Sequence, residues 1–383
     1  MKVFVIGNPD SFWFKYYLET IILPRYSDVS LLLEKGKKCK FLDFYSENKI
    51  NIVYCDNYNP LIMRIPKIRS LYMNNKKIKS IKEKYDLVIL LTCRYLDLKI
   101  AHSIKKKNGK VVAIFTGTDI LKLKKKQMLR LNNELDKCSA HVFASADNPA
   151  NKARQLEFVK QQGCTTIPFG LVSLSYIDKY RNSNLESFKK QYSIPDDRTV
   201  VCVGYNARPE QQHLEVIKNL ALLDDKTKLN ICVFLPMTYM RENAYCQRVK
   251  EAVEQSGLCY VMFENFMDQE EMAQLWLCCD IFINAQLSDA MSASIIECLH
   301  AGVKIINASW LKYSELERIN VNLESFSSLE EIPNIVKRYS NYKPDKCSIV
   351  QQNGYDTTLS NYKNSWNSAL DAIDSENIND NNI

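Results

Sequence analysis

Two carboxylates, Asp289 and Glu297, lie eight residues apart at the start of an expected helix. Within a helix this spacing is about 12 Å along the axis and about 80° around it, so both cannot bind one atom. They can instead hold opposite ends of an elongated ligand. Between them, the backbone N–H groups of Ala290, Met291 and Ser292 are expected to be free to bind an anion. This order of groups predicts a site for a ligand built from sugar, diphosphate and ribose.

Each carboxylate also has an ordinary structural interpretation. Asp289 would stabilise a helix N-terminus as a negative charge, and Glu297 would be a solvated surface residue. The neighbours of Glu297 are apolar, namely Ile295, Ile296, Cys298 and Leu299. A solvated glutamate is unexpected among them, which favours the ligand-binding interpretation.

A loop with one cation follows the expected strand at 199–204. Loops after parallel strands present ligands in α/β sheets, so Arg208 is a candidate to stabilise a departing diphosphate. An exposed arginine beside a proline is the alternative. Asn206 in the same loop is a weaker candidate. Tyr239, which follows the expected strand at 229–236, is a candidate neighbour of the nucleotide base.

In the first half of the chain, Gly117 and Asp119 follow the expected strand at 111–116. Glycine lets the backbone approach a ligand closely, and Asp119 could act as a base or bind acceptor hydroxyls. The same residues would make a good helix N-cap, and the sequence leaves both interpretations open. Gly7 and Asn8, after the first strand, have a similar position with weaker support. No G-x-G-x-x-G or P-loop pattern occurs, which argues against dinucleotide oxidoreduction and ATP hydrolysis.

Two series of alternating strands and helices must position these residues. Strands are expected at 2–7, 40–44, 52–55, 86–92, 111–116, 141–144 and 165–168, and then at 199–204, 229–236, 260–264, 281–285 and 303–307. Strands that alternate with helices predict parallel βαβ units and therefore two doubly wound sheets. We expect a Rossmann-like acceptor domain at 1–172, a linker at 173–198, a Rossmann-like nucleotide-sugar domain at 199–345, a helix at 346–374 packing back on the first domain, and a tail at 375–383.

The composition is that of a globular protein. Of the 383 residues, 46% are apolar and 25% are charged. No segment reaches about 18 uninterrupted apolar residues, and the first residues lack the apolar core of a signal peptide, so a cytoplasmic protein is expected. The thirteen cysteines include no C-x-x-C pair, and the four histidines are widely separated. We therefore expect structural thiols and no metal site.

Positive charge is concentrated in residues 61–130, which hold nineteen Lys or Arg against four Asp or Glu. This region has a net charge of +15, so the rest of a chain whose total is +7 has −8. Solvated helix faces are one explanation. The other is a surface for an anionic partner. Aromatic residues are sparse here and no nucleic-acid-binding motif is present, which favours membrane phosphates over nucleic acid.

Three segments, 117–120, 201–206 and 288–302, together resemble the glycosyltransferases with two Rossmann domains, known as the GT-B fold. Glycosyltransferase family 4 is the closest broad match, and its two acidic residues eight positions apart correspond to Asp289 and Glu297. The segment 235–245 resembles the bacterial transferases that add 4-acetamido-fucose to a polyprenyl-linked glycan. The resemblance implies an α/β chain whose two doubly wound domains face a cleft.

For individual residues, the resemblance implies that Glu297 accepts hydrogen bonds from the donor's ribose hydroxyls and that Asp289 lies near the donor sugar. The family usually has glutamate at the first of these positions. It also has a lysine after the arginine that corresponds to Arg208, and this chain has neither. Because no D-x-D motif is present, no metal or other cofactor is expected.

The resemblance and the charge together predict a glycosyltransferase of bacterial surface-glycan assembly, such as lipopolysaccharide or capsule, peripheral at the inner face of the plasma membrane. Its donor would be a nucleotide-diphosphate sugar and its acceptor a lipid-linked or phosphate-bearing glycan. Family 4 implies retention of anomeric configuration, whereas the fucosamine transferases imply inversion. A non-catalytic subunit that binds nucleotide-sugar is the alternative, and a nucleic-acid-binding protein is less favoured. The donor base, the sugar, the acceptor and the oligomeric state stay open.

Overall fold

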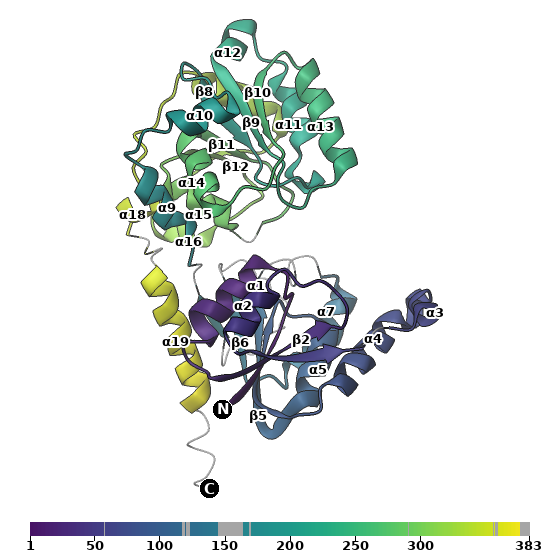
Figure 1. Cartoon of the computed structure of the whole chain (residues 1–383). Coiled ribbons are helices and arrows are strands. Elements are labelled where there is room, and N and C mark those ends of the chain that lie inside the picture. The colour runs from purple at the N-terminus through teal and green to yellow at the C-terminus, as the bar shows by residue number, and fades with distance from the viewer. Residues whose placement is uncertain are drawn as a thin grey trace. The chain divides into compact units, whose positions relative to one another are not determined.

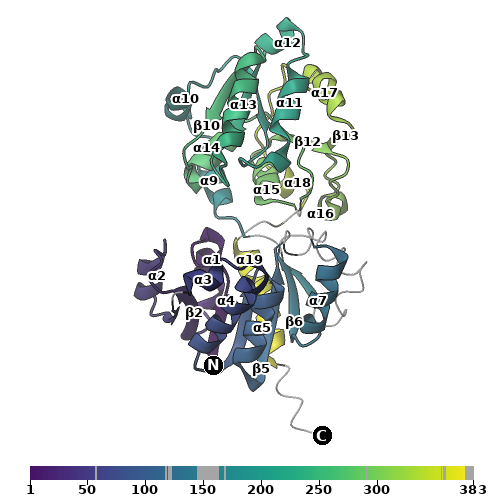
Figure 2. The same ribbon diagram turned by 90° about the vertical axis from the view of Figure 1, so that its right-hand side faces the viewer.

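The computed structural model describes residues 1–56, 58–116, 119, 123–144, 164–167, 170–289, 291–354, 356 and 359–375. The chain divides into two compact units, Met1–Pro168 with Ser360–Ile383, and Phe169–Leu359. Each unit contains one parallel sheet with helices packed around it (Figure 1 and Figure 2). The α/β class predicted from the alternation of strands and helices is confirmed.

The first unit contains a seven-stranded sheet in the order β3-β2-β1-β4-β5-β6-β7. Its strands are β1 (Lys2–Ile6), β2 (Asp28–Glu34), β3 (Asn51–Cys55), β4 (Tyr85–Leu91), β5 (Lys105–Phe115), β6 (Ala140–Ala144) and β7 (Cys164–Ile167). Its helices are α1 (Phe12–Tyr17), which continues as a π-helix over Leu18–Ile22, α2 (Leu42–Glu47), α3 (Pro60–Met63), α4 (Pro66–Ser80), α5 (Tyr95–Ile104), α7 (Lys125–Leu135) and α19 (Leu359–Ser375).

The strand expected at 40–44 is wrong, because this part of the chain leads into α2, and β2 takes the place beside β1. Of the side chains of α2 only Tyr45 is buried, and its hydroxyl donates to the Pro9 carbonyl at 2.6 Å. β2 is apolar from Val29 to Leu33 apart from Ser30, and it lies between β1 and β3. A strand in this position shows no polar alternation, so the periodicity that identifies edge and half-buried strands was absent.

The second unit contains a six-stranded sheet in the order β10-β9-β8-β11-β12-β13. Its strands are β8 (Thr199–Val203), β9 (Ile231–Pro236), β10 (Cys259–Phe263), β11 (Ile281–Asn284), β12 (Lys304–Ala308) and β13 (Glu324–Phe326). Its helices are α9 (Ser173–Tyr180), α10 (Glu186–Tyr192), α11 (His213–Leu220), α12 (Asp225–Leu229), α13 (Asn243–Gln255), α14 (Gln269–Cys278), α15 (Ala293–His300), α16 (Ser314–Arg318), α17 (Ile332–Arg338) and α18 (Ile349–Gln352), with 3-10 turns at Pro209–Gln211 and Leu329–Glu331.

Two segments outside the sheets are assigned to units by their packing. Residues 173–198, expected to be a linker, form α9 and α10 in the second unit, where α9 packs along α14 and α15. The C-terminal helix α19 packs in the first unit. There Tyr362 stacks on Tyr16 and Trp366 meets Tyr17 edge to face.

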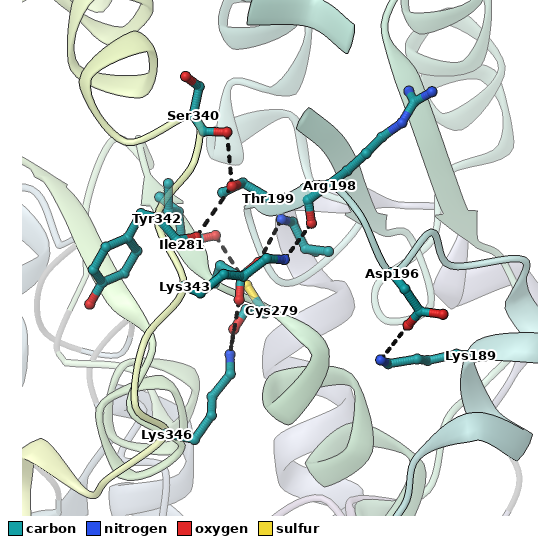
Figure 3. A network of polar contacts seen from close by, with 12 residues as sticks. Lys189, Asp196, Arg198, Thr199, Cys279, Ile281, Ser340, Tyr342, Lys343 and Lys346 are labelled. Atoms are coloured by element: carbon teal, nitrogen blue, oxygen red, sulfur yellow. Dashed lines mark hydrogen bonds and ion pairs between the residues drawn. The ribbon is translucent and has the colours of Figure 1, made fainter. Parts of the chain in front are cut away.

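A buried carboxylate at the amino ends of β8 and β11 holds the returning chain in the second unit. Asp280 accepts the Val200 backbone N–H at 2.9 Å, and the ammonium groups of Lys343 and Lys346 lie 2.9 and 3.3 Å from it. Beside it, Thr199 donates its hydroxyl to the Ser340 carbonyl at 3.0 Å (Figure 3). These contacts hold the segment after α17 against the amino ends of β8 and β11. The loops that follow these two strands begin at the opposite, carboxyl ends.

The strand orders define one switch point in each sheet. β1 lies between β2 and β4, and β8 lies between β9 and β11. At such a point the loops that follow the two neighbouring strands diverge, which leaves room for a ligand at the carboxyl ends. The sequence-predicted site residues of the second unit belong to these loops or to the helix that follows β11.

Candidate functional site

Loops after β8, β9 and β11 are bonded to one another in the second unit. The Ala207 N–H donates to the Tyr239 carbonyl at 2.8 Å, and the Leu287 N–H donates to the Glu210 carbonyl at 2.9 Å. Tyr205 donates its hydroxyl to a side-chain oxygen of Gln286 at 3.2 Å. The three loops therefore form one connected surface at the switch point.

Asp289 is positioned by two donors on this surface. Its Oδ2 accepts the Ser292 backbone N–H at 3.0 Å and the Tyr313 hydroxyl at 2.7 Å. Burial and the Asp289 charge raise the pKa of Tyr313 well above its ordinary value, so Tyr313 stays a donor. Burial, followed by the same carboxylate, raises the pKa of Tyr205 to about 12.

The expected anion site at the start of α15 is in part wrong. The Ser292 N–H was expected to be free, but it is used by Asp289, because a carboxylate three residues earlier reaches the helix start. Met291 has a positive φ of 60° and a buried side chain. Ala290 lies outside the described residues.

A chain of buried amides supports Asp289 from the sheet. Asn284, the last residue of β11, donates its amide to the Tyr313 hydroxyl at 2.9 Å and to Asn307 Oδ1 on β12 at 2.8 Å. Asn307 in turn donates to the Leu311 carbonyl at 2.9 Å. These residues were not identified from the sequence. The sequence did contain a sign of this chain of amides, because Asn284 and Asn307 lie near the ends of two apolar strands and a buried amide needs hydrogen-bond partners.

Glu297 lies about one turn into α15 and is half-buried, so it is not a fully solvated surface residue. Its Oε1 accepts the Ser173 hydroxyl at 2.5 Å, and its Oε2 accepts the Trp276 indole N–H at 3.0 Å. Burial raises the pKa of this carboxyl, and the two donors act in the opposite direction. Each carboxylate oxygen can accept a further hydrogen bond, so these contacts orient Glu297 without using its full capacity.

Arg208, Asn206 and Tyr239 lie together in the loops after β8 and β9. Asn206 is buried, and its side-chain oxygen accepts the Arg208 backbone N–H at 3.0 Å, which fixes the turn. The Arg208 guanidinium Nη2 lies 3.1 Å from Met240 Sδ. The Tyr239 side chain is 55% exposed. The structure thus brings these three predicted residues together, with Arg208 as the cation of the loop.

Gly204 turns the chain out of β8 into this loop. Its φ is +66°, and a Cβ here would lie 2.7 Å from His213 Nε2 and 2.9 Å from Gln211 Oε1. His213 is fully buried, and burial lowers its pKa to about 3, so it stays neutral. Gln211 donates to Gln286 Oε1 at 3.1 Å. The amide of Gln211, just after Arg208, therefore holds this loop against Gln286 in the loop after β11.

In the first unit, Asp119 ties together the ends of β4 and β5. Its carboxylate accepts the Cys93 backbone N–H at 3.2 Å and the Thr116 backbone N–H at 3.0 and 3.1 Å. The contact with Thr116, three residues earlier, is the kind made at a helix start. Gly117 lies outside the described residues. A catalytic role for Asp119 stays a prediction.

A cavity of about 280 Å³ opens at the carboxyl ends of β1, β2 and β4 in the first unit. Gly7 permits the close approach of Phe14, since a Cβ at Gly7 would lie 2.4 Å from that ring. Seven charged side chains line the cavity, namely Lys37, Lys38, Lys77 and Arg94 with Asp10, Glu34 and Asp97. Burial raises the pKa of Asp97, and Arg94 and Lys77 lower it. The lining is therefore mixed in charge, and two of its cations are ion-paired, Lys37 with Glu34 at 3.6 Å and Arg94 with Asp97 at 3.9 Å.

The sequence pointed to this cavity only through Gly7 and Asn8. Its charged residues come from four separate parts of the first unit, so their convergence depends on the fold. Among the described residues, no group of three or more His, Cys, Asp or Glu side chains could hold a metal ion. No helix in the described part of the chain is long and apolar enough to cross a membrane.

A scan against protein-family models and a search of curated proteins each found no match to the sequence. Solved structures match over almost the whole chain. HepE of Anabaena in complex with UDP-glucose is 14% identical with a TM-score of 0.69, and the match covers 97% of this chain and 99% of that one. A glycosyltransferase of Rickettsia africae is 17% identical with a TM-score of 0.67 and 98% of both chains covered.

The lipopolysaccharide outer core galactosyltransferase WaaB is 9% identical with a TM-score of 0.65, and the match covers 97% of this chain and 99% of that one. At these identities the likeness concerns the fold and not the residues of the site. The two parallel sheets and the full-length matches show that this chain has the GT-B fold.

Proposed function

We propose that this chain is a glycosyltransferase that takes a sugar from a nucleotide-diphosphate donor bound at the carboxyl ends of β8 and β11. The observation that carries the proposal is the oriented set of Asp289, Arg208 and Glu297 at and beside the switch point. The carboxylates of Asp289 and Glu297 are held by hydrogen bonds within the second unit, and the Arg208 guanidinium lies against Met240 Sδ. HepE was solved with UDP and with UDP-glucose, which supports uridine nucleotides as the first donors to test.

In the proposed reaction the anomeric carbon loses its bond to the diphosphate and gains one to an acceptor oxygen, whose proton is released. Arg208 would stabilise the negative charge that grows on the leaving diphosphate. Glu297 would accept the ribose hydroxyls, and Asp289 would hold the hydroxyls of the donor sugar. The stereochemical course is proposed to be retention, as in glycosyltransferase family 4.

For the acceptor we propose a lipid-linked or surface glycan that carries phosphate. Four cations, Lys37, Lys38, Lys77 and Arg94, line the first unit's cavity against three carboxylates, and this excess of one positive charge supports an anionic group on that substrate. The net charge of +15 on residues 61–130 supports work at the inner, anionic face of a membrane. We propose no metal or other cofactor for the reaction.

A non-catalytic subunit that binds nucleotide-sugar is the second candidate. It is favoured by the absence of a lysine after Arg208 in this loop, since the resembling transferases carry one. Gln211 bonds to Gln286 and Gln212 to the Ala285 carbonyl, so these side chains serve the loops. A single cation leaves less charge to stabilise a leaving diphosphate.

The release of nucleoside diphosphate from UDP-glucose and other nucleotide-sugars, with and without lipid-linked acceptors, separates the two candidates. The proposal expects turnover by the wild type and a loss of at least about tenfold in kcat for Arg208→Ala. Arg248→Ala on the exposed face of α13 is the matched control and should keep full activity. Tight donor binding without turnover on any acceptor would support the non-catalytic subunit instead.

A further inference from the structure

Four large apolar side chains within residues 61–71 are exposed in the first unit, on α3, at the N-cap of α4 and in the first turns of α4. Leu61 is 69% exposed, Ile65 47%, Ile68 44% and Leu71 53%. Ile68 and Leu71 are three residues apart and so share one side of α4. Among the described residues of the first unit, the buried core cluster around α5 includes Ile81, with Ile78 packed against it, from the other end of α4 and none of these four side chains.

The charge around these side chains is of one sign. Residues 59–82 contain seven Lys or Arg and no Asp or Glu. Among the basic residues, Arg64, Arg69, Lys79 and Lys82 are exposed. A helical segment that combines exposed apolar residues with cations is typical of elements that lie in the interface of an anionic membrane. The same charge disfavours a second copy of this segment as the occupant, because two such surfaces would repel each other.

α4 connects this surface to the cavity of the first unit. In Figure 1, α3 lies at the end of α4 that is remote from the sheet. Lys77, near the other end of α4, lines the cavity. Leu71 and Lys77 are six residues apart, which is about 9 Å along a helix. A phosphate group at a membrane surface would therefore lie within a short distance of the cavity's cations once the exposed end of α4 had docked.

We propose that α3 and the first turns of α4 dock on an anionic bilayer, with Leu61, Ile65, Ile68 and Leu71 inserted among the acyl chains and the flanking cations on the phosphates. This proposal deepens the membrane-facing part of the proposed function and rests on it. It requires no donor, so vesicle binding and donor binding can fail independently.

The test is co-sedimentation of the full chain with vesicles of phosphatidylglycerol and phosphatidylcholine in equal parts, and with vesicles of phosphatidylcholine alone. We expect the wild type to bind the anionic vesicles, and the triple variant Leu61→Ser, Ile68→Ser and Leu71→Ser to bind at least about tenfold more weakly. The control Leu222→Ser with Leu229→Ser removes side chains that are 78% and 66% exposed in the second unit. It should bind as the wild type does.

Two further measurements complete the test. The single variant Leu61→Ser, on the short helix α3, should weaken binding in the same direction if the triple variant proves unstable in a melting experiment. High salt should weaken the binding of the wild type, because cations contribute to it. Equal vesicle binding by the wild type and the triple variant would overturn the proposal. So would a dimer in solution that the triple variant dissociates, since a second copy would then cover the surface.

Discussion

The Tyr313 hydroxyl lies 2.7 Å from Asp289 Oδ2 and at the same time accepts the Asn284 amide at 2.9 Å. The carboxylate that starts the candidate donor site is thereby connected to the end of β11 through buried groups. Aspartate is one methylene shorter than the glutamate usual in the resembling family. The position of the Asp289 carboxylate is set by the Tyr313 hydroxyl, which comes from a different part of the chain, and not by the length of the aspartate side chain alone.

Replacing Tyr313 by phenylalanine tests this connection. Tyr313→Phe should keep the fold and lower donor affinity or turnover about tenfold, because Asp289 loses a buried donor worth about 1–3 kcal/mol. The matched control is Tyr339→Phe, which removes a hydroxyl bonded to Glu324 at 2.9 Å, at the amino end of β13. Kinetics of both variants check the prediction. Equal effects of the two changes would contradict it.

Glu297→Gln tests the buried carboxyl through pH. The pKa of folded Glu297 is raised above its ordinary value of 4.5. As pH rises above about 4.5 the unfolded chain ionises this group first, so the wild type loses stability up to the raised folded pKa. The glutamine variant lacks this loss. Its stability relative to the wild type should therefore increase with pH in this window, as measured by urea unfolding.

The same variant has a second readout that separates binding from folding. Above the raised pKa of Glu297 the donor affinity of Glu297→Gln should fall, because an amide replaces a carboxylate acceptor for the ribose hydroxyls. A stability difference that does not change with pH would show that Glu297 is already ionised in the folded protein.

Gly204→Ala tests the turn that opens the loop with Arg208. The added Cβ would meet the buried His213 and Gln211 side chains at 2.7 and 2.9 Å and would suffer a φ of +66°. Gly257→Ala is a matched control, since its φ is +71° and its Cβ would meet only Lys228 Nζ at 4.0 Å. The control should lose about 1–2 kcal/mol and Gly204→Ala roughly 1–3 kcal/mol more. Equal losses in urea unfolding would contradict the close packing.

Asp280→Ala tests the contacts of Asp280 with Val200, Lys343 and Lys346. It leaves two ammonium groups and the Val200 N–H without their acceptor, so the free energy of unfolding should fall by about 2–4 kcal/mol. Asp196→Ala removes the exposed ion pair with Lys189, and its melting temperature should stay close to that of the wild type. If both variants melt like the wild type, Asp280 does not hold the segment after α17.

Much of the fold was predictable because its strands alternate with amphipathic helices. A glycine just after a helix commonly ends it, and Gly302, which follows α15, has a positive φ of 76°. The prediction failed at β2, where burial in the middle of the sheet removed the polar alternation. Residues 173–198, expected to be a linker with a short helix, form α9 and α10 in the second unit. Local patterns report local periodicity and contain little information about burial by distant elements.

The candidate site was predictable to the same extent. Asp289 and Glu297 stand out by spacing, whereas their partners Tyr313, Ser173 and Trp276 come from separate elements. The charged residues of the first unit's cavity are likewise distant in sequence. Side chains that meet only through packing leave no spacing pattern, so the sequence could nominate the ligand-binding groups without the residues that orient them.

The most direct test of the central claim is a calorimetric titration of the intact chain with UDP, GDP and dTDP at one salt concentration. One of these should bind with a stoichiometry of one per chain, and Arg208→Ala should weaken that binding about tenfold or more while Arg248→Ala leaves it unchanged. A chain that binds none of the three nucleotides, or binds one equally well without Arg208, would contradict a donor site at the ends of β8 and β11.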